Sequence, residues 1–106
     1  MNTKERIVVD LNAIMETYAS KQHNVILLND EPNTPNPTPF EYVILVLMTV
    51  FNKDEMTAEA NTMEAHICGN CIIGTYDYDE AEKLVNQAYA LNEATGFNLR
   101  FDIKSI

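Results

Sequence analysis

Residues 24–51 read NVILLNDEPNTPNPTPFEYVILVLMTVF and contain, in order, an apolar run, a proline-rich segment and a helical pattern. Asn24 to Leu28 is rich in strand-forming residues, which predicts a β-strand. All four prolines follow within residues 31–39, and this segment is predicted to be a loop because proline removes backbone donors. Apolar residues then recur at helical spacing and predict a helix: Phe40, Val43, Ile44, Leu47 and Phe51.

The start of this helix carries a capping pattern. Thr38 is predicted to be the N-cap, with Pro39 at the first helical position and Glu41 completing a capping box. A second helix is predicted from Lys53 to Ile67, capped by Asn52 and stopped by Gly69. Its apolar residues are few: Met56, Ala60, Met63 and Ile67.

The rest of the chain predicts a strand, a helix and a final strand. The strand covers Cys71 to Tyr76, and the helix runs from a capping box at Asp77 to a stop at Gly96. Apolar and polar residues then alternate from Leu99 to Lys104, as in a strand with one buried face. The order β-α-α-β-α-β predicts an α+β fold, a two-layer sandwich with a small sheet.

Length and charge limit the classes of function. The chain has 106 residues, which predicts one core domain, residues 23–106, preceded by a flexible extension of residues 1–22. A net charge of −9 disfavours a nucleic-acid partner or an anionic membrane surface. The longest apolar run, residues 43–48, is far shorter than the roughly 20 residues that span a bilayer, and the first residues lack the apolar region of a secretory signal.

Two cysteines form the first candidate for chemistry. Cys68 and Cys71 have the spacing of a redox couple or of half a zinc site, and His66 lies two residues upstream. A structural zinc site needs four ligands, however, and the sequence has no second cysteine pair. A thioredoxin-like motif runs from a strand into a helix, whereas these cysteines lie between a predicted helix and a predicted strand. The sequence also lacks a nucleophile elbow, a phosphate-binding glycine loop and a His-Glu-x-x-His helix. We therefore predict a protein that is not an enzyme and binds no cofactor.

A second candidate combines polar residues after the first predicted strand with a distant histidine. Asn29, Asp30 and Glu31 follow the strand, and His66 lies near the end of the second helix. An amide oxygen, a carboxylate and an imidazole nitrogen are acceptors, which suits an ammonium group with its three donors. The chemistry indicates a site for a protonated amine.

Several segments together resemble the ClpS family, whose members deliver N-end rule substrates to Clp AAA+ proteases. The resemblance covers about residues 24–104 and rests on Val25 to Glu31, Thr38 to Ile44, Val46-Leu47, Glu64-Ala65-His66, Ile72 to Tyr76 and Ala81-Glu82. It implies a core like the C-terminal domain of the ribosomal stalk protein, with a three-stranded antiparallel sheet.

The resemblance also implies a binding site for the first residue of a substrate, an N-degron. Asn29, Asp30 and His66 would hold the free α-amine. The walls of a hydrophobic pocket carry over to Leu27, Leu28, Thr38, Phe40, Val43, Thr62, Ala65 and Leu99.

Some positions depart from the family pattern. Phe40 and Thr62 stand where methionines are common, and Ala65 stands where valine is common. Smaller residues deepen a pocket and a stiff ring narrows its entrance, so we predict Phe, Tyr, Trp and Leu as first residues, with a preference for aromatics. Residues Pro32 to Pro37 also lengthen the loop beside the pocket, where the family commonly has about one residue.

The resemblance further implies a partner, the N-terminal domain of a Clp unfoldase of the ClpA or ClpC type. Asp79 matches the family's acidic docking residue, whereas position 84 is Leu and the nearest lysine is Lys83. Residues 1–22 would be engaged by the unfoldase. We expect a monomer in the cytoplasm, in a plastid stroma, or in a host cytoplasm if the gene is viral.

Two other hypotheses stay open at this point. One is a domain of the same fold that modulates the unfoldase as a decoy without binding degrons. The other is a redox or metal-binding protein that uses Cys68 and Cys71.

Overall fold

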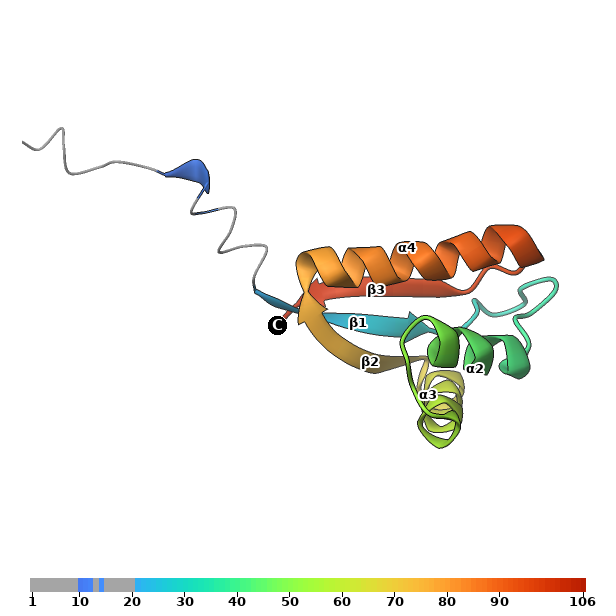
Figure 1. Ribbon diagram of the computed structural model, residues 1–106. Coiled ribbons are helices and arrows are strands. Elements are labelled where there is room, and N and C mark those ends of the chain that lie inside the picture. Colours follow the sequence, from blue (N-terminus) through green and yellow to red (C-terminus); the bar gives the residue numbers. More distant parts are fainter. Residues whose placement is uncertain (1–9, 13, 15–20) are drawn as a thin grey trace, which may run out of the picture.

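A computed structural model describes residues 10–12, 14 and 21–106 of the chain (Figure 1). Its elements follow in the predicted β-α-α-β-α-β order, which confirms the α+β fold. They are β1 (Gln22–Leu28), α2 (Phe40–Thr49), α3 (Glu55–Cys68), β2 (Asn70–Asp77), α4 (Tyr78–Thr95) and β3 (Arg100–Ser105).

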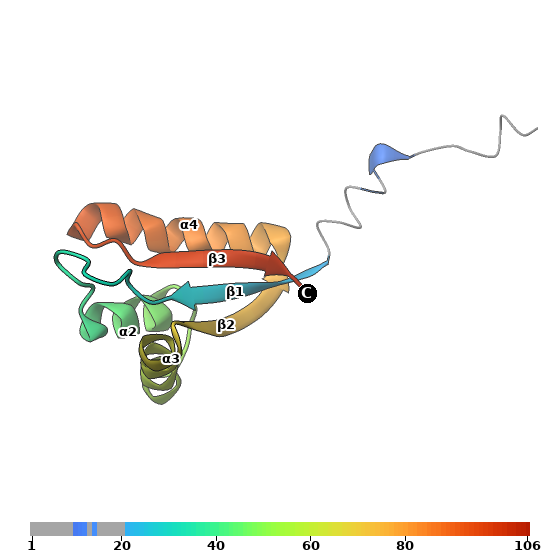
Figure 2. The ribbon, with the colours of Figure 1, turned by 180° about the vertical axis from the view of Figure 1, so that it is seen from behind.

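The sheet has β1 in its centre. Both neighbours, β2 and β3, pair with β1 in antiparallel fashion. Along β1, His23, Val25 and Leu27 are buried, and the residues between them are partly exposed. The helices cover the buried face, and the strands lie uncovered when the molecule is seen from behind (Figures 1 and 2). This arrangement is the two-layer sandwich that the sequence predicts.

The core lies between β1 and the helices. Val25, Val46 and Leu47 have no exposed surface, and Leu27 is 1% exposed. From α4, the buried residues Ala81, Val85 and Ala88 complete the core at a spacing that keeps them on one helical face. The end of β1 is thus fixed within a close-packed interior.

The predicted cap of α2 is wrong. The N-cap is Pro39, in an extended conformation, and no side chain caps this helix. Thr38 instead donates its backbone N–H and its hydroxyl to the carboxylate of Asp30. The threonine that the pattern assigns to the helix therefore belongs to the loop.

The start of α3 is also later than predicted. Asp54, not Asn52, is the N-cap, and its side chain accepts a hydrogen bond from the N–H of Thr57. That bond lowers the pKa of the Asp54 carboxyl group. Asn52 has a φ of 56° and so belongs to the turn between the helices. The predicted stop is confirmed, since Gly69 has a φ of 93°.

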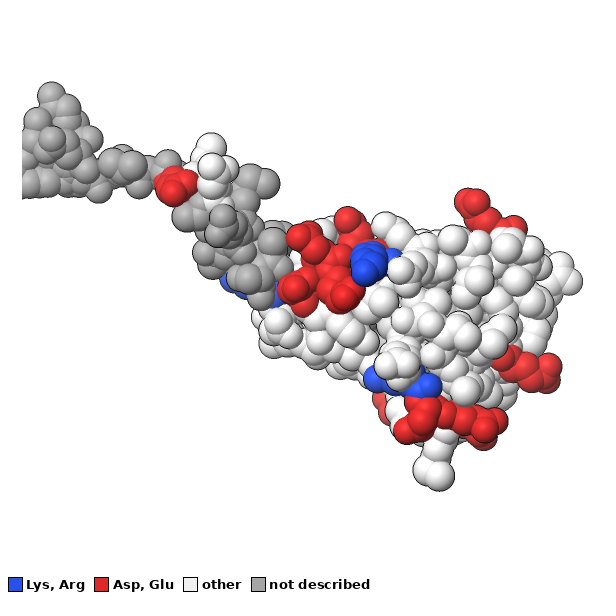
Figure 3. All heavy atoms as spheres, viewed as in Figure 1, with Lys and Arg blue, Asp and Glu red and all other residues white. Residues whose placement is uncertain are grey.

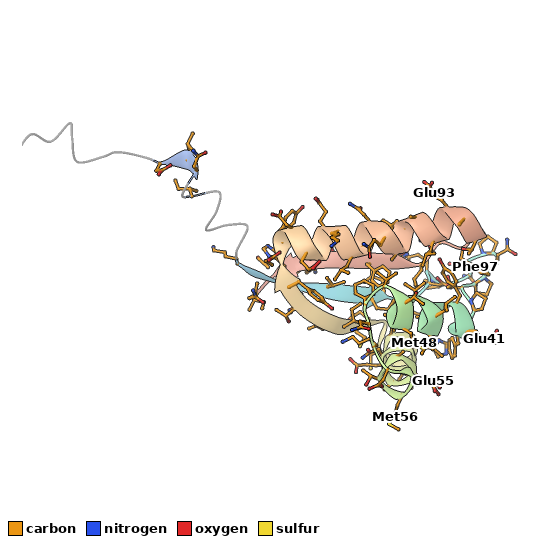
Figure 4. The ribbon with its side chains drawn as sticks, in the orientation of Figure 1. Glu41, Met48, Glu55, Met56, Glu93 and Phe97 are labelled. Atoms are coloured by element: carbon orange, nitrogen blue, oxygen red, sulfur yellow. The ribbon has the colours of Figure 1, made fainter. Side chains whose placement is uncertain are left out.

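The buried side of α3 consists of small residues, Ala58, Thr62 and Ala65. Its larger apolar residues point outward, and Met56, at 81% exposure, projects away from the end of the helix (Figure 4). The side chains that α3 turns toward the core are therefore short.

The predicted N-cap of α4 is confirmed. The Asp77 side chain accepts a hydrogen bond from the N–H of Glu80 at 2.8 Å, and the helix ends at Gly96, whose φ is 83°. This cap begins the longest helix directly after β2.

We predict that Asp77→Ala lowers the free energy of unfolding by about 1 kcal/mol, because the variant loses the acceptor for the N–H of Glu80. Urea unfolding measures the change. Gln87→Ala, an exposed position within the same helix, is the matched control and should change stability little. An equal loss in both variants would contradict a capping role.

The predicted extension, residues 1–22, lies mostly outside the described residues, and its role stays a prediction. The first described strand, β1, begins at Gln22. No helix within the described residues is both long and apolar enough to cross a membrane.

Candidate functional site

One small cavity lies at the end of β1, where the start of α2 and the end of α3 meet. Its lining includes all the residues predicted to hold an amine or to form the apolar pocket. They are Leu27, Leu28, Asn29, Asp30, Thr38, Phe40, Val43, Thr62, Ala65, His66 and Leu99. Side chains 72 positions apart in sequence therefore share one site.

Asn29 is held on three sides. Its backbone N–H donates to the carbonyl oxygen of Gly69 at 3.0 Å, and its own carbonyl accepts from Nη2 of Arg100 at 2.6 Å. Its side-chain Nδ2 donates to the carbonyl oxygen of His66 at 3.3 Å. Since the amide nitrogen is used within the protein, the side-chain oxygen is left as an acceptor for a ligand.

Asp30 ties the loop to the end of β1. Its Oδ2 accepts the N–H of Thr38 at 2.6 Å, and its Oδ1 accepts the hydroxyl of Thr38 at 3.0 Å. A carboxylate has about four lone-pair directions, so each oxygen can still accept a further donor. Asp30 therefore fixes the wall of the cavity and also supplies its negative charge.

His66 and Phe40 lie together at the rim of the cavity. Their ring centroids are 5.0 Å apart in an edge-to-face arrangement, which is favourable for aromatic rings. Phe40 is 41% exposed, whereas the walls formed by Leu27, Val43 and Leu99 are buried. Phe40 is thus the apolar lining residue with the most freedom to change its rotamer.

The cavity is small, at about 30 Å³. A cavity that binds benzene is about five times larger, at about 150 Å³. A large apolar side chain therefore needs more space than this cavity has, and Phe40, the most exposed of its apolar lining residues, is placed to provide it by changing its rotamer.

The inner wall is less polar than its composition indicates. Thr62 is buried, and its hydroxyl donates to the carbonyl oxygen of Ala58 at 2.7 Å within α3. Because this hydroxyl already has an acceptor, Thr62 contributes no unsatisfied donor to the cavity.

Sequence reasoning missed Arg100. It begins β3, and its guanidinium contacts both the carbonyl oxygen of Asn29 and, at 3.5 Å, the carboxylate of Glu31. In the sequence Arg100 is one polar residue of an alternating strand. That pattern predicts an outward-facing side chain, but it does not predict a contact with Asn29, which is 71 residues away in the sequence.

The two predicted docking residues lie elsewhere, exposed in the first turns of α4. Asp77, just before α4, lies opposite Gln22 at the start of β1. The cavity lies at the far end of β1, about 20 Å away along the strand. Lys83 approaches Glu80 at 4.0 Å. Acidic side chains gather around the junction of β2 and α4 (Figure 3).

The cysteines differ in environment. Cys68 is exposed and Cys71 is buried, and both are free thiols. Burial, with Glu64 nearby, raises the pKa of the Cys71 thiol to about 11, so this thiol is protonated at neutral pH. No group of three metal-binding side chains occurs within the described part of the chain. These observations favour a structural role for Cys71 over redox chemistry.

Comparison with known proteins gives consistent matches. The family model for the ATP-dependent Clp protease adaptor protein ClpS matches residues 18–102. A ClpS protein of Nautilia profundicola is 33% identical over 94% of both chains, and one of Wolinella succinogenes is 38% identical over 76% of this chain and 74% of its own. The structure of Agrobacterium tumefaciens ClpS2 bound to L-phenylalaninamide has a TM-score of 0.73 and 33% identity, covering 82% of this chain and 99% of its own.

Proposed function

Because the chain belongs to the ClpS family of adaptors, which deliver N-end rule substrates to Clp protease, we propose that the cavity at the end of β1 binds the first residue of such a substrate. The protein is a non-catalytic adaptor. One observation carries the proposal: Asn29, Asp30 and His66 line the same cavity as a set of apolar walls. Phenylalaninamide, bound by the Agrobacterium relative, likewise combines a free amine with a benzyl group.

The polar residues match the chemistry of a free α-amine. Its pKa is about 7.7 to 8.0, so it is mostly protonated at neutral pH and offers three N–H donors. The side-chain oxygen of Asn29, a carboxylate oxygen of Asp30 and a neutral ring nitrogen of His66 accept them. An internal lysine has a free amine but no apolar side chain beside it to fill the pocket. An acetylated terminus has the apolar side chain but no free amine.

Neither part of the ligand suffices alone. Charge-assisted hydrogen bonds contribute roughly 1.5 to 3 kcal/mol each, and burial of a Leu or Phe side chain contributes a similar roughly 1.5 to 3 kcal/mol. Association itself costs several kcal/mol. Together the two contributions reach about micromolar affinity, so binding requires both a free amine and a large apolar side chain.

We predict that a Phe-initiated peptide binds at least about tenfold more tightly than its acetylated form, since acetylation removes the charge and donors that the three polar groups accept. Fluorescence titration of both peptides measures the difference. His66→Ala should weaken binding of the free peptide and leave the affinity for the acetylated peptide unchanged.

Met56→Ala is the matched control for His66→Ala, because Met56 lies on α3 but is 81% exposed and outside the cavity. It should leave binding unchanged. Equal binding of free and acetylated peptides by the unmodified protein would reject the amine site and favour the decoy hypothesis.

Specificity follows from the walls of the cavity. We propose that Phe, Tyr, Trp and Leu are bound, because Thr62 and Ala65 are small and the ring of Phe40 narrows the entrance.

We predict that Phe binds about tenfold more tightly than Ile or Val as first residue, since β-branched side chains are widest where the entrance is narrowest. Titration of peptides that differ only at the first position measures this. Phe40→Ala should reduce the discrimination, whereas Leu45→Ala, exposed on the same helix and outside the cavity, should not. Equal affinity of the unmodified protein for Phe and Ile would be inconsistent with this role of Phe40.

The adaptor's partner is a Clp unfoldase. We propose that it is of the ClpA or ClpC type and that its N-terminal domain contacts Asp79 and Lys83. The family's docking lysine would fall at position 84, but this chain has Leu84 there, packed against the core. The neighbouring Lys83 is therefore the residue that we propose for this contact. Engagement of residues 1–22 by the unfoldase, a monomeric state and a cytoplasmic location are further parts of this proposal.

A further inference from the structure

Asn29 lies one residue beyond the end of the central strand. β1 ends at Leu28, which lies opposite Asn70 of β2 on one side and Arg100 of β3 on the other. These are the last pairs of both ladders, so the pairing of the sheet does not continue to Asn29. Each residue has two soft backbone dihedral angles, and outside a ladder other contacts must fix them.

Two hydrogen bonds fix the peptide groups on either side of the Asn29 Cα atom. The group before it donates its N–H to the carbonyl oxygen of Gly69 at 3.0 Å. The group after it, shared with Asp30, accepts from Nη2 of Arg100 at 2.6 Å. Peptide groups are planar, so these two bonds together fix the backbone of Asn29 and the direction in which its side chain leaves it.

The bond from Arg100 is the shortest of the three that hold Asn29. The third bond, from the side-chain Nδ2 of Asn29 to the carbonyl oxygen of His66, measures 3.3 Å. A charged donor makes a stronger hydrogen bond than a neutral one, and the Arg100 side chain is only 34% exposed. Nη1 of the same guanidinium lies 3.5 Å from the carboxylate of Glu31, which helps to orient it. The contact with Arg100 is therefore expected to be the strongest of the three.

Arg100 itself lies outside the proposed amine site. It does not line the cavity that contains Asn29, Asp30 and His66. Asp30 has a restraint of its own, in its two hydrogen bonds with Thr38. Apart from its charge, Arg100 therefore acts on a bound amine through Asn29.

We infer that Arg100 is a positioning residue for the α-amine, because it holds the side-chain oxygen of Asn29 in the direction from which that oxygen accepts an amine N–H. The inference rests on the proposed function, since it needs the α-amine to be bound by Asn29. The charge of Arg100 acts in the opposite sense: a guanidinium repels a protonated amine, so loss of the charge alone would strengthen binding. Positioning and charge thus predict opposite results when Arg100 is replaced.

Arg100→Leu separates the two effects, since leucine keeps an apolar side chain at this strand position and removes every donor. We expect this variant to bind a peptide that begins with Phe-Ala about fivefold more weakly than the unmodified protein does, and to bind the acetylated form of the same peptide equally well. Fluorescence titration measures both affinities. Arg100→Lys, which keeps the charge and an N–H donor, should bind the free peptide within about twofold of the unmodified protein.

Lys104→Leu is the matched control. Lys104 lies on the same strand and the same face of the sheet as Arg100, but it is opposite Asn24, and its side chain is 68% exposed. This variant loses the same unit of charge without losing a contact to Asn29. Its affinity for the Phe-Ala peptide should be unchanged or slightly higher, and a loss equal to that of Arg100→Leu would overturn the inference.

An Asn29→Ala background distinguishes positioning from a general structural role. Without the side-chain oxygen of Asn29 there is nothing for Arg100 to position, so adding Arg100→Leu should weaken binding by less than about a further twofold. A further fivefold loss in that background would overturn the inference. Equal weakening of the free and acetylated peptides by Arg100→Leu alone would overturn it as well.

The unmodified protein tests the proposed function separately. Failure of the Phe-Ala peptide to bind would contradict the proposed function itself, whereas equal binding by Arg100→Leu and the unmodified protein would overturn only the inference. Circular dichroism establishes whether each variant is folded at the temperature of the titration. If Arg100→Leu is unfolded there, Arg100→Gln takes its place, with the same expected loss.

Discussion

Asp30→Ala is expected to weaken binding of a Phe-Ala peptide by about a hundredfold. The variant loses a charge-assisted hydrogen bond to the α-amine, which alone accounts for roughly 1.5 to 3 kcal/mol. It also releases both the N–H and the hydroxyl of Thr38, so this part of the cavity wall is no longer fixed. Fluorescence titration of the purified variant measures the loss.

An exposed carboxylate outside the cavity provides the control. Glu55→Gln, at the start of α3, leaves Asp30 and Thr38 in place and should not change the affinity for Phe-Ala. Circular dichroism establishes whether Asp30→Ala is folded at the temperature of the titration. A folded Asp30→Ala variant that binds within threefold of the unmodified protein would show that the carboxylate does not hold the amine.

Leu47→Ala is expected to lower the free energy of unfolding by about 3 kcal/mol. Leu47 has no exposed surface and lies on α2 within the main core, so its truncation leaves a cavity as well as losing buried apolar area. For a domain of this size that loss corresponds to a fall in melting temperature of about 10 to 20 °C. Urea and thermal unfolding measure both quantities.

Leu45→Ala is the matched control, since Leu45 lies on the same helix at 51% exposure. It should change the free energy of unfolding by less than about 0.5 kcal/mol. An equal loss of stability in both variants would mean that the burial of a leucine on α2 does not determine how much it contributes to stability.

The sequence predicted the elements and their order because each signal acts locally. Asp77 and Gly96 mark the ends of α4 through contacts within a few residues, and both were predicted correctly. Thr38 and Asn52 match the same local patterns and were assigned the wrong role. Thr38 bonds to Asp30 instead, a residue that no helix pattern includes.

The candidate site required more than local patterns. The grouping of Asn29, Asp30 and His66 came from amine chemistry and the family resemblance, since spacing alone does not bring residue 66 to residue 30. Arg100 was missed because its contacts with Asn29 and Glu31 exist only once β3 lies beside β1.

The edge-to-face contact between Phe40 and His66, in the wall of a cavity of about 30 Å³, has a consequence for the time course of binding. If the first side chain enters only after the ring of Phe40 turns away, the observed association rate levels off at high peptide concentration, at the rate of ring opening. The apparent dissociation constant then equals the intrinsic one divided by the open fraction. Opening then sets how fast the adaptor captures a substrate, while the cavity walls, Phe40 among them, set which substrates it retains.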